Sequence, residues 1–189
     1  MSVSAGSAVV VRRAAEVVAL ALCLDACRLP YIPYVTSPHP AALARLRDAT
    51  GRVVGQGVFL QQGGGVRILI DVNDLPEGVK AVHIHEVGRC DAPSFETAGA
   101  HFNPTKAEHG TKNPRGSHAG DLPDITVDAS GRGHLELTTT RIGLEKGPTS
   151  LLDADGSALV IHERADDQRT DPAGESGGRI ACGAIVKGS

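Results

Sequence analysis

An all-β fold, an antiparallel sandwich or flattened barrel, is predicted for most of this 189-residue chain. From Ala42 onward, short apolar runs alternate with glycine-rich turns, and no segment keeps a helical period over three turns. Glycine (23) and proline (11) together exceed their average share, which indicates many turns and long loops. Because the chain has no Trp, three Phe and two Tyr, its core is expected to be aliphatic.

The first 27 residues are predicted to be a signal or anchor segment. Arg12 and Arg13 precede the apolar run of residues 17–24, which is too short to span a bilayer but is typical of a secretory signal. The residues before Cys27 resemble a lipoprotein cleavage site, so the exported protein would be either free or tethered to a membrane through Cys27. Export is favoured over the alternative, a poorly ordered N-terminal helix on a cytosolic protein.

Residues 28–41 are predicted to be a proline-rich tether, because residues 28–40 hold four prolines. Residues 42–189 then form a single predicted domain. Glycine-rich turns at residues 63–65 and 130–133 are hairpin signals. About eight strands are expected, among them residues 52–61, 66–72, 79–85, 125–128, 134–139, 158–162 and 180–186.

Two long, polar connections at residues 86–121 and 163–178 interrupt the strands. Loops longer than about 12–15 residues inside a compact domain are usually functional. The functional site is therefore expected to be built on these loops.

A net charge of −3 with a pI near 6.2 argues against nucleic acid as a partner, since proteins that bind it usually carry a basic surplus.

The four cysteines are consistent with export. Removal of the signal would take away Cys23, with or without Cys27, and leave Cys90 and Cys182 as a pair. In an oxidising compartment such a pair normally forms a disulfide. Closing a loop of about 90 residues would stabilise the fold by roughly 4–5 kcal/mol in the chain-entropy model. Two buried free thiols are the alternative.

Metal-ligating side chains recur along the domain. His83 and His85 are two residues apart on a predicted strand, so both point to the same side of it. The other candidate ligands are His101, His109, His118, Asp121 and His162. Seven ligands are too many for one tetrahedral ion, so two metals that share a ligand are expected. Sites rich in imidazole favour copper and zinc.

The stretch from Ala42 to Val186 resembles a copper–zinc superoxide dismutase. The phrases that carry the resemblance are V-H-I-H-E, A-G-A-H-F-N-P, H-G, H-A-G-D-L-P, S-L-L-D-A-D-G-S-A-L-V-I-H-E and T-D-P-A-G-E-S-G-G-R-I-A-C-G. The last phrase and the D-L-P are similar to the bacterial, periplasmic branch. Departures are small: Ala81-Val82 stands where the family often has Gly-Phe, and the loop after His162 is short.

The resemblance implies an eight-stranded antiparallel Greek-key β-sandwich or flattened barrel and a role for each ligand. Copper would be held by His83, His85, His101 and His162. Zinc would be held by His101, His109, His118 and Asp121. His101 would bridge the two metals, and Cys90 and Cys182 match the family's disulfide. Asp166 matches a carboxylate that hydrogen-bonds His83 and His109, and Arg179 matches an arginine that stands over the copper.

The implied function is dismutation of superoxide to dioxygen and hydrogen peroxide, in a monomer or a homodimer of the periplasm. His101 would take up and release a proton during the cycle. Attraction of the anion would require a local positive region. The candidates for that region are Arg89, Lys106, Lys112, Arg115 and Arg169.

Two other functions fit parts of the sequence. One is a non-catalytic copper-handling or metal-buffering protein of the same fold, although such proteins typically lack some copper ligands or the arginine. The other is a zinc hydrolase that uses three histidines and a water, which leaves the extra ligands unexplained.

Overall fold

The computed structural model of the protein describes residues 41–188. The predicted signal segment, the tether up to residue 40 and the lipid-attachment site at Cys27 lie outside these described residues. Residue 41, which we assigned to the tether, is instead the first residue of a strand. Within residues 41–188, no helix has the length and apolar character needed to cross a membrane.

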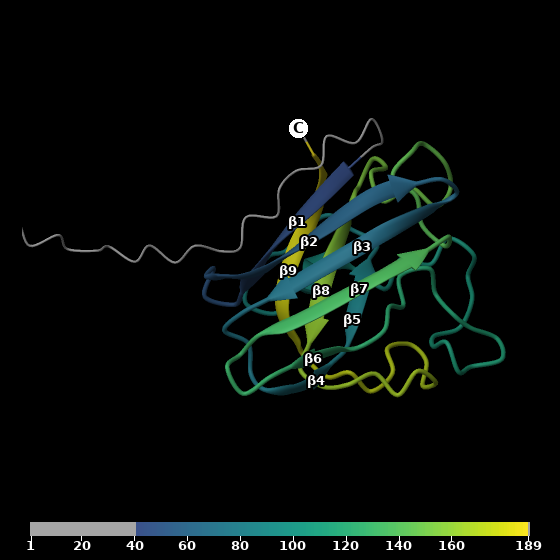
Figure 1. The fold of residues 1–189 in the computed structure, drawn as a ribbon. Helices are drawn as coiled ribbons and strands as arrows, with labels where there is room; N and C mark the ends of the chain where they lie inside the picture. The colour runs from purple at the N-terminus through teal and green to yellow at the C-terminus, as the bar shows by residue number, and fades with distance from the viewer. Residues whose placement is uncertain (1–40, 189) are drawn as a thin grey trace, which may run out of the picture. The chain divides into compact units, whose positions relative to one another are not determined.

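The described residues form a single nine-stranded antiparallel sheet with one short 3₁₀ turn, Glu96–Ala98 (Figure 1). The strands are β1 (Ala41–Asp48), β2 (Val53–Gln62), β3 (Gly65–Val72), β4 (Gly78–Lys80), β5 (Val82–His85), β6 (Ile125–Val127), β7 (Gly133–Thr139), β8 (Ser157–His162) and β9 (Arg179–Lys187). Their order in the sheet is β4-β6-β7-β3-β2-β1-β9-β8-β5. These nine antiparallel strands confirm the all-β prediction. The pairs β3·β7 and β1·β9 join strands that are not consecutive in the chain.

The two strands at the ends of this order, β4 and β5, are separated in the chain only by Ala81. We predicted one strand over residues 79–85, and its division at Ala81 is why the structure has nine strands where about eight were expected. The N–H of Ala81 donates to the carbonyl O of Arg164 (2.7 Å), and its carbonyl accepts from the N–H of His162 (2.9 Å). The sheet therefore closes on itself at this residue, as in a flattened barrel.

The aliphatic core lies inside this closed sheet. On β5, Val82 and Ile84 belong to the core, and on β8, Leu159 and Ile161 do. All four side chains are fully buried. Since strand residues alternate between faces, the intervening side chains of β5 and β8 point to the outer face of the sheet.

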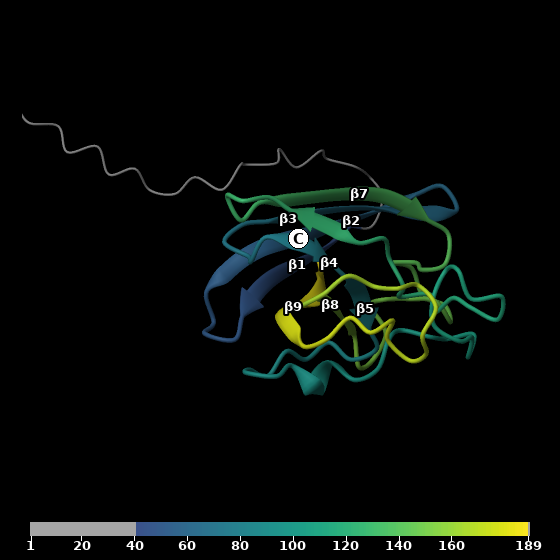
Figure 2. The same cartoon turned by 90° about the horizontal axis from the view of Figure 1, so that it is seen from below.

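The outer face of β5, β8 and β9 is covered by the two long loops, drawn in teal and yellow in Figure 2. A second apolar cluster there combines Phe95 and Ala98 of the first loop with Ala158, Val160 and Cys182 of the sheet. The predicted disulfide between Cys90 and Cys182 is confirmed, and it joins the first loop to β9. All six residues of β8 are buried, because the loops cover the face that would otherwise meet solvent.

Candidate metal centre

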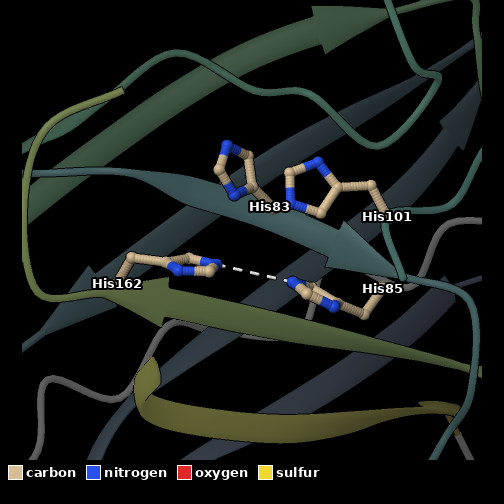
Figure 3. A group of neighbouring side chains, drawn as sticks. All are labelled: His83, His85, His101 and His162. Carbon is tan, nitrogen blue, oxygen red and sulfur yellow. Dashed lines mark hydrogen bonds between the residues drawn. The ribbon is translucent and has the colours of Figure 1, made fainter. Parts of the chain in front are cut away.

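Three of the candidate ligands are placed by strands. His83 and His85 alternate with the core residues of β5 and therefore lie on its outer face. His162 ends β8, which is paired antiparallel to β5. Figure 3 shows these three side chains close together with His101, which comes from the loop. All four are buried, so their ring nitrogens need partners inside the protein.

The first loop is fixed by backbone hydrogen bonds to the edge of β5 that faces away from β8. The N–H of Ile84 donates to the carbonyl of Gly120 (2.9 Å), and the N–H of Phe102 donates to the carbonyl of Ile84 (2.8 Å). A Cβ at Gly120 would lie 2.2 Å from the Ile84 carbonyl O, so glycine is required at this approach. These contacts place His101 and Asp121, the neighbours of Phe102 and Gly120, beside β5.

A first group of donor atoms belongs to His83, His85, His101 and His162, and these atoms all lie within 4.8 Å of one another. The buried atoms Nδ1 of His83 and Nε2 of His101 have no hydrogen-bond partner in the described residues. Nε2 of His85 and Nε2 of His162 lie 3.4 Å apart. Buried polar atoms without partners are uncommon in native proteins, and a cation between these nitrogens would satisfy them. The four side chains therefore fit a metal ion.

A second group consists of His83, His101, His109 and Asp121. Oδ1 of Asp121 lies 3.0 Å from Nδ1 of both His101 and His109. His118 is not a member of this group, but its Nδ1 lies 3.2 Å from Oδ1 of Asp121 and 3.3 Å from Nδ1 of His101. The structure thus gathers the four side chains that we predicted for zinc around Oδ1 of Asp121, with His83 close by.

The carboxylate of Asp166 links His83 to His109 by two hydrogen bonds. Its Oδ2 accepts from Nε2 of His83 (2.8 Å), and its Oδ1 accepts from Nε2 of His109 (2.9 Å). Each ring nitrogen that faces Asp166 therefore carries a proton. When such a ring is neutral, its Nδ1 has the lone pair that a metal ion would need. Gly174 contacts this carboxylate so closely that a Cβ there would lie 1.8 Å from Oδ1 of Asp166.

Burial keeps three imidazoles of the first group neutral. Together with a smaller effect of the neighbouring His83, it lowers the pKa of His101 to about 4 and that of His162 to about 3. Burial also holds the pKa of His85 well below its usual range. For His109, burial opposes protonation, but the carboxylates of Asp121 and Asp166 raise its pKa to about 9. Neutral imidazoles are the form that coordinates metals, so His85, His101 and His162 are ready to bind at neutral pH.

Arg179, the first residue of β9, lies beside the first group. Its Nη1 donates to the carbonyl of Phe95 (2.7 Å), and its Nη2 donates to the carbonyl of Gly99 (2.8 Å). Nδ1 of His85 donates to the same Gly99 carbonyl (2.9 Å). The guanidinium is thus fixed next to His85, and 16% of the side chain remains exposed. It can present a positive charge to a small anion that reaches the histidines.

Sequence reasoning missed two residues that hold the loops. Arg141 donates to the side chain of Ser117 and to the carbonyl of Asp121 (2.5 Å). The side chain of Gln168 accepts from Oγ1 of Thr111 (2.8 Å) and so ties the second loop to the first. A single arginine or glutamine in a loop carries no signal in one sequence, because its partners are distant along the chain.

Two of the five cationic residues that we considered for anion attraction are paired with carboxylates: Arg89 with Asp91, and Arg115 with Glu108. Their charges are largely offset at short range. Among residues 41–188, the other three candidates make no salt bridge: Lys106, Lys112 and Arg169.

Comparison with known proteins decides the family. The model of the copper/zinc superoxide dismutase family matches residues 53–185, which include every candidate ligand. The chain belongs to this family. The resemblance in the sequence phrases is therefore confirmed. Among its relatives, the copper–zinc superoxide dismutase 1 of Aquifex aeolicus is 44% identical over 144 residues, which cover 75% of this chain and 85% of the relative.

Two further bacterial proteins are similar over much of the chain. The copper–zinc superoxide dismutase of Deinococcus radiodurans is 40% identical over 179 residues, covering 88% of this chain and 92% of that protein. The superoxide dismutase-like protein YojM of Bacillus subtilis is 48% identical over 124 residues, covering 65% of this chain and 63% of that one. A solved structure of a SOD-like protein from Bacillus subtilis matches with a TM-score of 0.73 at 42% identity, covering 76% and 97% of the two chains.

Proposed function

We propose that the protein is a superoxide dismutase with one copper and one zinc ion. His83 and His101 both belong to the two groups of donor atoms, and the observation that carries the proposal is the placement of the two ring nitrogens of His101. Its Nε2 is buried without a partner, and its Nδ1 faces Asp121. One imidazole with a nitrogen toward each group is suited to bridge two ions.

The proposed ligands follow these groups, except that His118, whose Nδ1 lies 3.2 Å from Oδ1 of Asp121, takes the place of His83 in the second group. Copper would be held by His83, His85, His101 and His162, and zinc by His101, His109, His118 and Asp121. Sites rich in imidazole bind both metals well, and a carboxylate suits zinc more than copper. When bound, copper supplies a one-electron redox couple and zinc a fixed positive charge.

The side chains of the protein would bind the substrate anion and hold a proton. The guanidinium of Arg179, held by the carbonyls of Phe95 and Gly99, would bind superoxide beside the first group. Nε2 of His101 would hold a proton between the two half-reactions. In total, two superoxide ions and two protons give one dioxygen and one hydrogen peroxide.

A second candidate is a non-catalytic copper-handling or metal-buffering role. The similarity to the superoxide dismutase-like protein of Bacillus subtilis supports this second candidate. The presence of all seven candidate ligands and of Arg179 in this chain favours the enzyme.

The deciding experiment measures metal content and superoxide removal on the same purified, reloaded protein. We expect one copper, one zinc and rapid superoxide removal. Arg179→Ala should lower activity by about tenfold or more with unchanged metal content, because a hydrogen bond to a charged group is worth about 1.5–3 kcal/mol. Arg67→Ala, which removes an exposed arginine paired with Glu136, is the matched control and should change nothing. Full metal content without activity would favour the buffering role.

We propose export to the periplasm as the location, which the disulfide between Cys90 and Cys182 supports because disulfides persist in oxidising compartments. Cell fractionation with mass measurement of the mature N-terminus would test this and would detect a lipid on Cys27. Recovery of the full-length chain in the cytosol would contradict it.

A further inference from the structure

Ser176 lies in the second loop, and its side chain contacts the ring of His162. The residue is 1% exposed. Its carbonyl accepts from the N–H of Arg164 (2.9 Å), and its N–H donates to the carbonyl of Ala173 (3.3 Å), so its backbone is held on both sides. Its Oγ lies 3.1 Å from Nδ1 of His162, which is its side-chain partner among the described residues.

The neighbouring ring of His85 favours one of the two tautomers of His162 in the metal-free protein. Nδ1 of His85 lies 2.9 Å from the carbonyl of Gly99, and a carbonyl can only accept. The proton of a neutral His85 is therefore on Nδ1, and its Nε2 has a lone pair. That lone pair faces Nε2 of His162 at 3.4 Å, along the dashed line in Figure 3. Two lone pairs facing each other would repel, so this contact places the proton of a neutral His162 on Nε2 as long as Nδ1 also has a hydrogen-bond donor.

In this tautomer, Nδ1 of His162 needs a hydrogen-bond donor. The carbonyl of Gly177 is 3.3 Å away and cannot donate. The hydroxyl of Ser176 can. When Nε2 of His162 is instead a metal ligand, its proton must sit on Nδ1, and both the Gly177 carbonyl and Oγ of Ser176 can then accept. A hydroxyl can serve as donor or acceptor, so Ser176 matches either tautomer.

We propose that Ser176 is a positioning residue for His162, whose hydroxyl donates to Nδ1 in the metal-free protein and accepts from it when Nε2 binds copper. The metal-free half of this inference stands on hydrogen-bond geometry alone, and the second half rests on the proposed copper site. The role keeps the ring in one orientation while the proton moves from one nitrogen to the other.

The first test uses ¹⁵N chemical shifts of the histidine rings in the metal-free protein, which report the tautomer directly. The wild type is expected to carry the His162 proton on Nε2. In Ser176→Ala the donor to Nδ1 is gone, so the proton is expected on Nδ1, where the Gly177 carbonyl accepts it. Ser157→Ala is the matched control, because it removes another fully buried hydroxyl, one without a hydrogen-bond partner, from the strand that carries His162. An Nδ1 proton in the wild type, or the same tautomer in wild type and Ser176→Ala, would overturn the proposal.

The second test measures copper affinity by competition with a chelator. Loss of a partner that orients a metal ligand typically lowers affinity by about 10–100-fold, so Ser176→Ala is expected to bind copper at least tenfold more weakly. Ser176→Thr keeps the hydroxyl and should recover the wild-type tautomer and most of the affinity. Equal losses in Ser176→Ala and Ser157→Ala would overturn the positioning role. Failure of the wild type to bind copper would contradict the proposed function instead, and the tautomer measurement would still decide the metal-free half.

Discussion

At the scale of single residues, the metal centre depends on residues that hydrogen-bond the candidate ligands or pack against those that do. Asp166 fixes the protonated nitrogens of His83 and His109, and the closeness of Gly174 leaves room for no larger side chain. Asp166 was expected from the family resemblance. Gly174 was not, because a glycine in a glycine-rich loop looks like any other until the carboxylate beside it is known.

Gly174→Ala is predicted to weaken zinc binding. The new Cβ would lie 1.8 Å from Oδ1 of Asp166 and 2.7 Å from Nε2 of His109, so that hydrogen bond must break, and the positive φ of 62° adds strain. We expect at least a tenfold loss of zinc affinity, measured by chelator competition. Gly147→Ala is the control and should bind zinc normally, because a Cβ added at this glycine would have no atom within 4 Å. Equal affinity of both variants would show that Asp166 does not orient His109.

At the scale of elements, the centre is the layer between the outer face of the sheet and its two loops. The first loop is attached to β9 by the disulfide, to β5 by backbone hydrogen bonds, and to the segment after β7 by Arg141. The strand ligands were predictable, since the alternation of β5 assigns its histidines to one face. The course of the loop was not, because each of its attachments joins residues distant in sequence.

Replacing both Cys90 and Cys182 by serine is predicted to lower the free energy of unfolding by about 4–5 kcal/mol in the chain-entropy model. The two residues are 92 positions apart, so the disulfide restricts a long segment of the unfolded chain. Denaturant unfolding of the metal-free protein would measure the loss. The wild type under reducing conditions is the matched comparison and should lose the same amount. A loss below about 1 kcal/mol would indicate that the loop is held mainly by its other contacts.

Arg141→Met is predicted to weaken zinc binding about tenfold and to leave copper binding nearly unchanged. The arginine holds Ser117 and the carbonyl of Asp121, which flank the end of the loop that carries His118. Metal competition on the two ions separately would measure both effects. Arg132→Met, at an exposed arginine of the turn before β7, is the control. Parallel losses of both metals would mean that Arg141 supports the whole layer and not the zinc side alone.

At the scale of the described domain, the all-β class and the approximate strands followed from the sequence, because turn residues and alternation are local signals. The strand order did not, since β1·β9 and β3·β7 pair across long separations. The division of residues 79–85 at Ala81 also could not be predicted, because it depends on partners from both ends of the sheet.

The metal-free domain is predicted to lose stability on acidification from pH 7 to pH 5. The pKa values of His85, His101 and His162 are lowered by burial, so the unfolded chain binds protons below pH 6.5 that the folded protein resists. The pKa of His109, raised to about 9, contributes stability that is present below pH 6.5 and lost as the pH rises toward 9. Denaturant unfolding at pH 5, 7 and 9 should therefore give the highest stability near pH 7. His134→Gln, which changes an exposed histidine, should show the same profile. A stability that is flat between pH 5 and 7 would contradict the prediction.

The loop that covers the outer edge of β5 also affects how copies of the protein can associate. β5 is hydrogen-bonded to β8 on one edge, and its other edge is occupied by the backbone of Phe102, Gly120 and Leu122. With that edge occupied, a neighbouring molecule cannot extend the sheet through β5 by strand addition. The residues that occupy the edge belong to the ligand-bearing loop, so the contacts that assemble the metal centre also shield this strand from self-association. Release of the loop would expose an unpaired strand edge that can bind another chain, and it would also separate the ligands of the metal site.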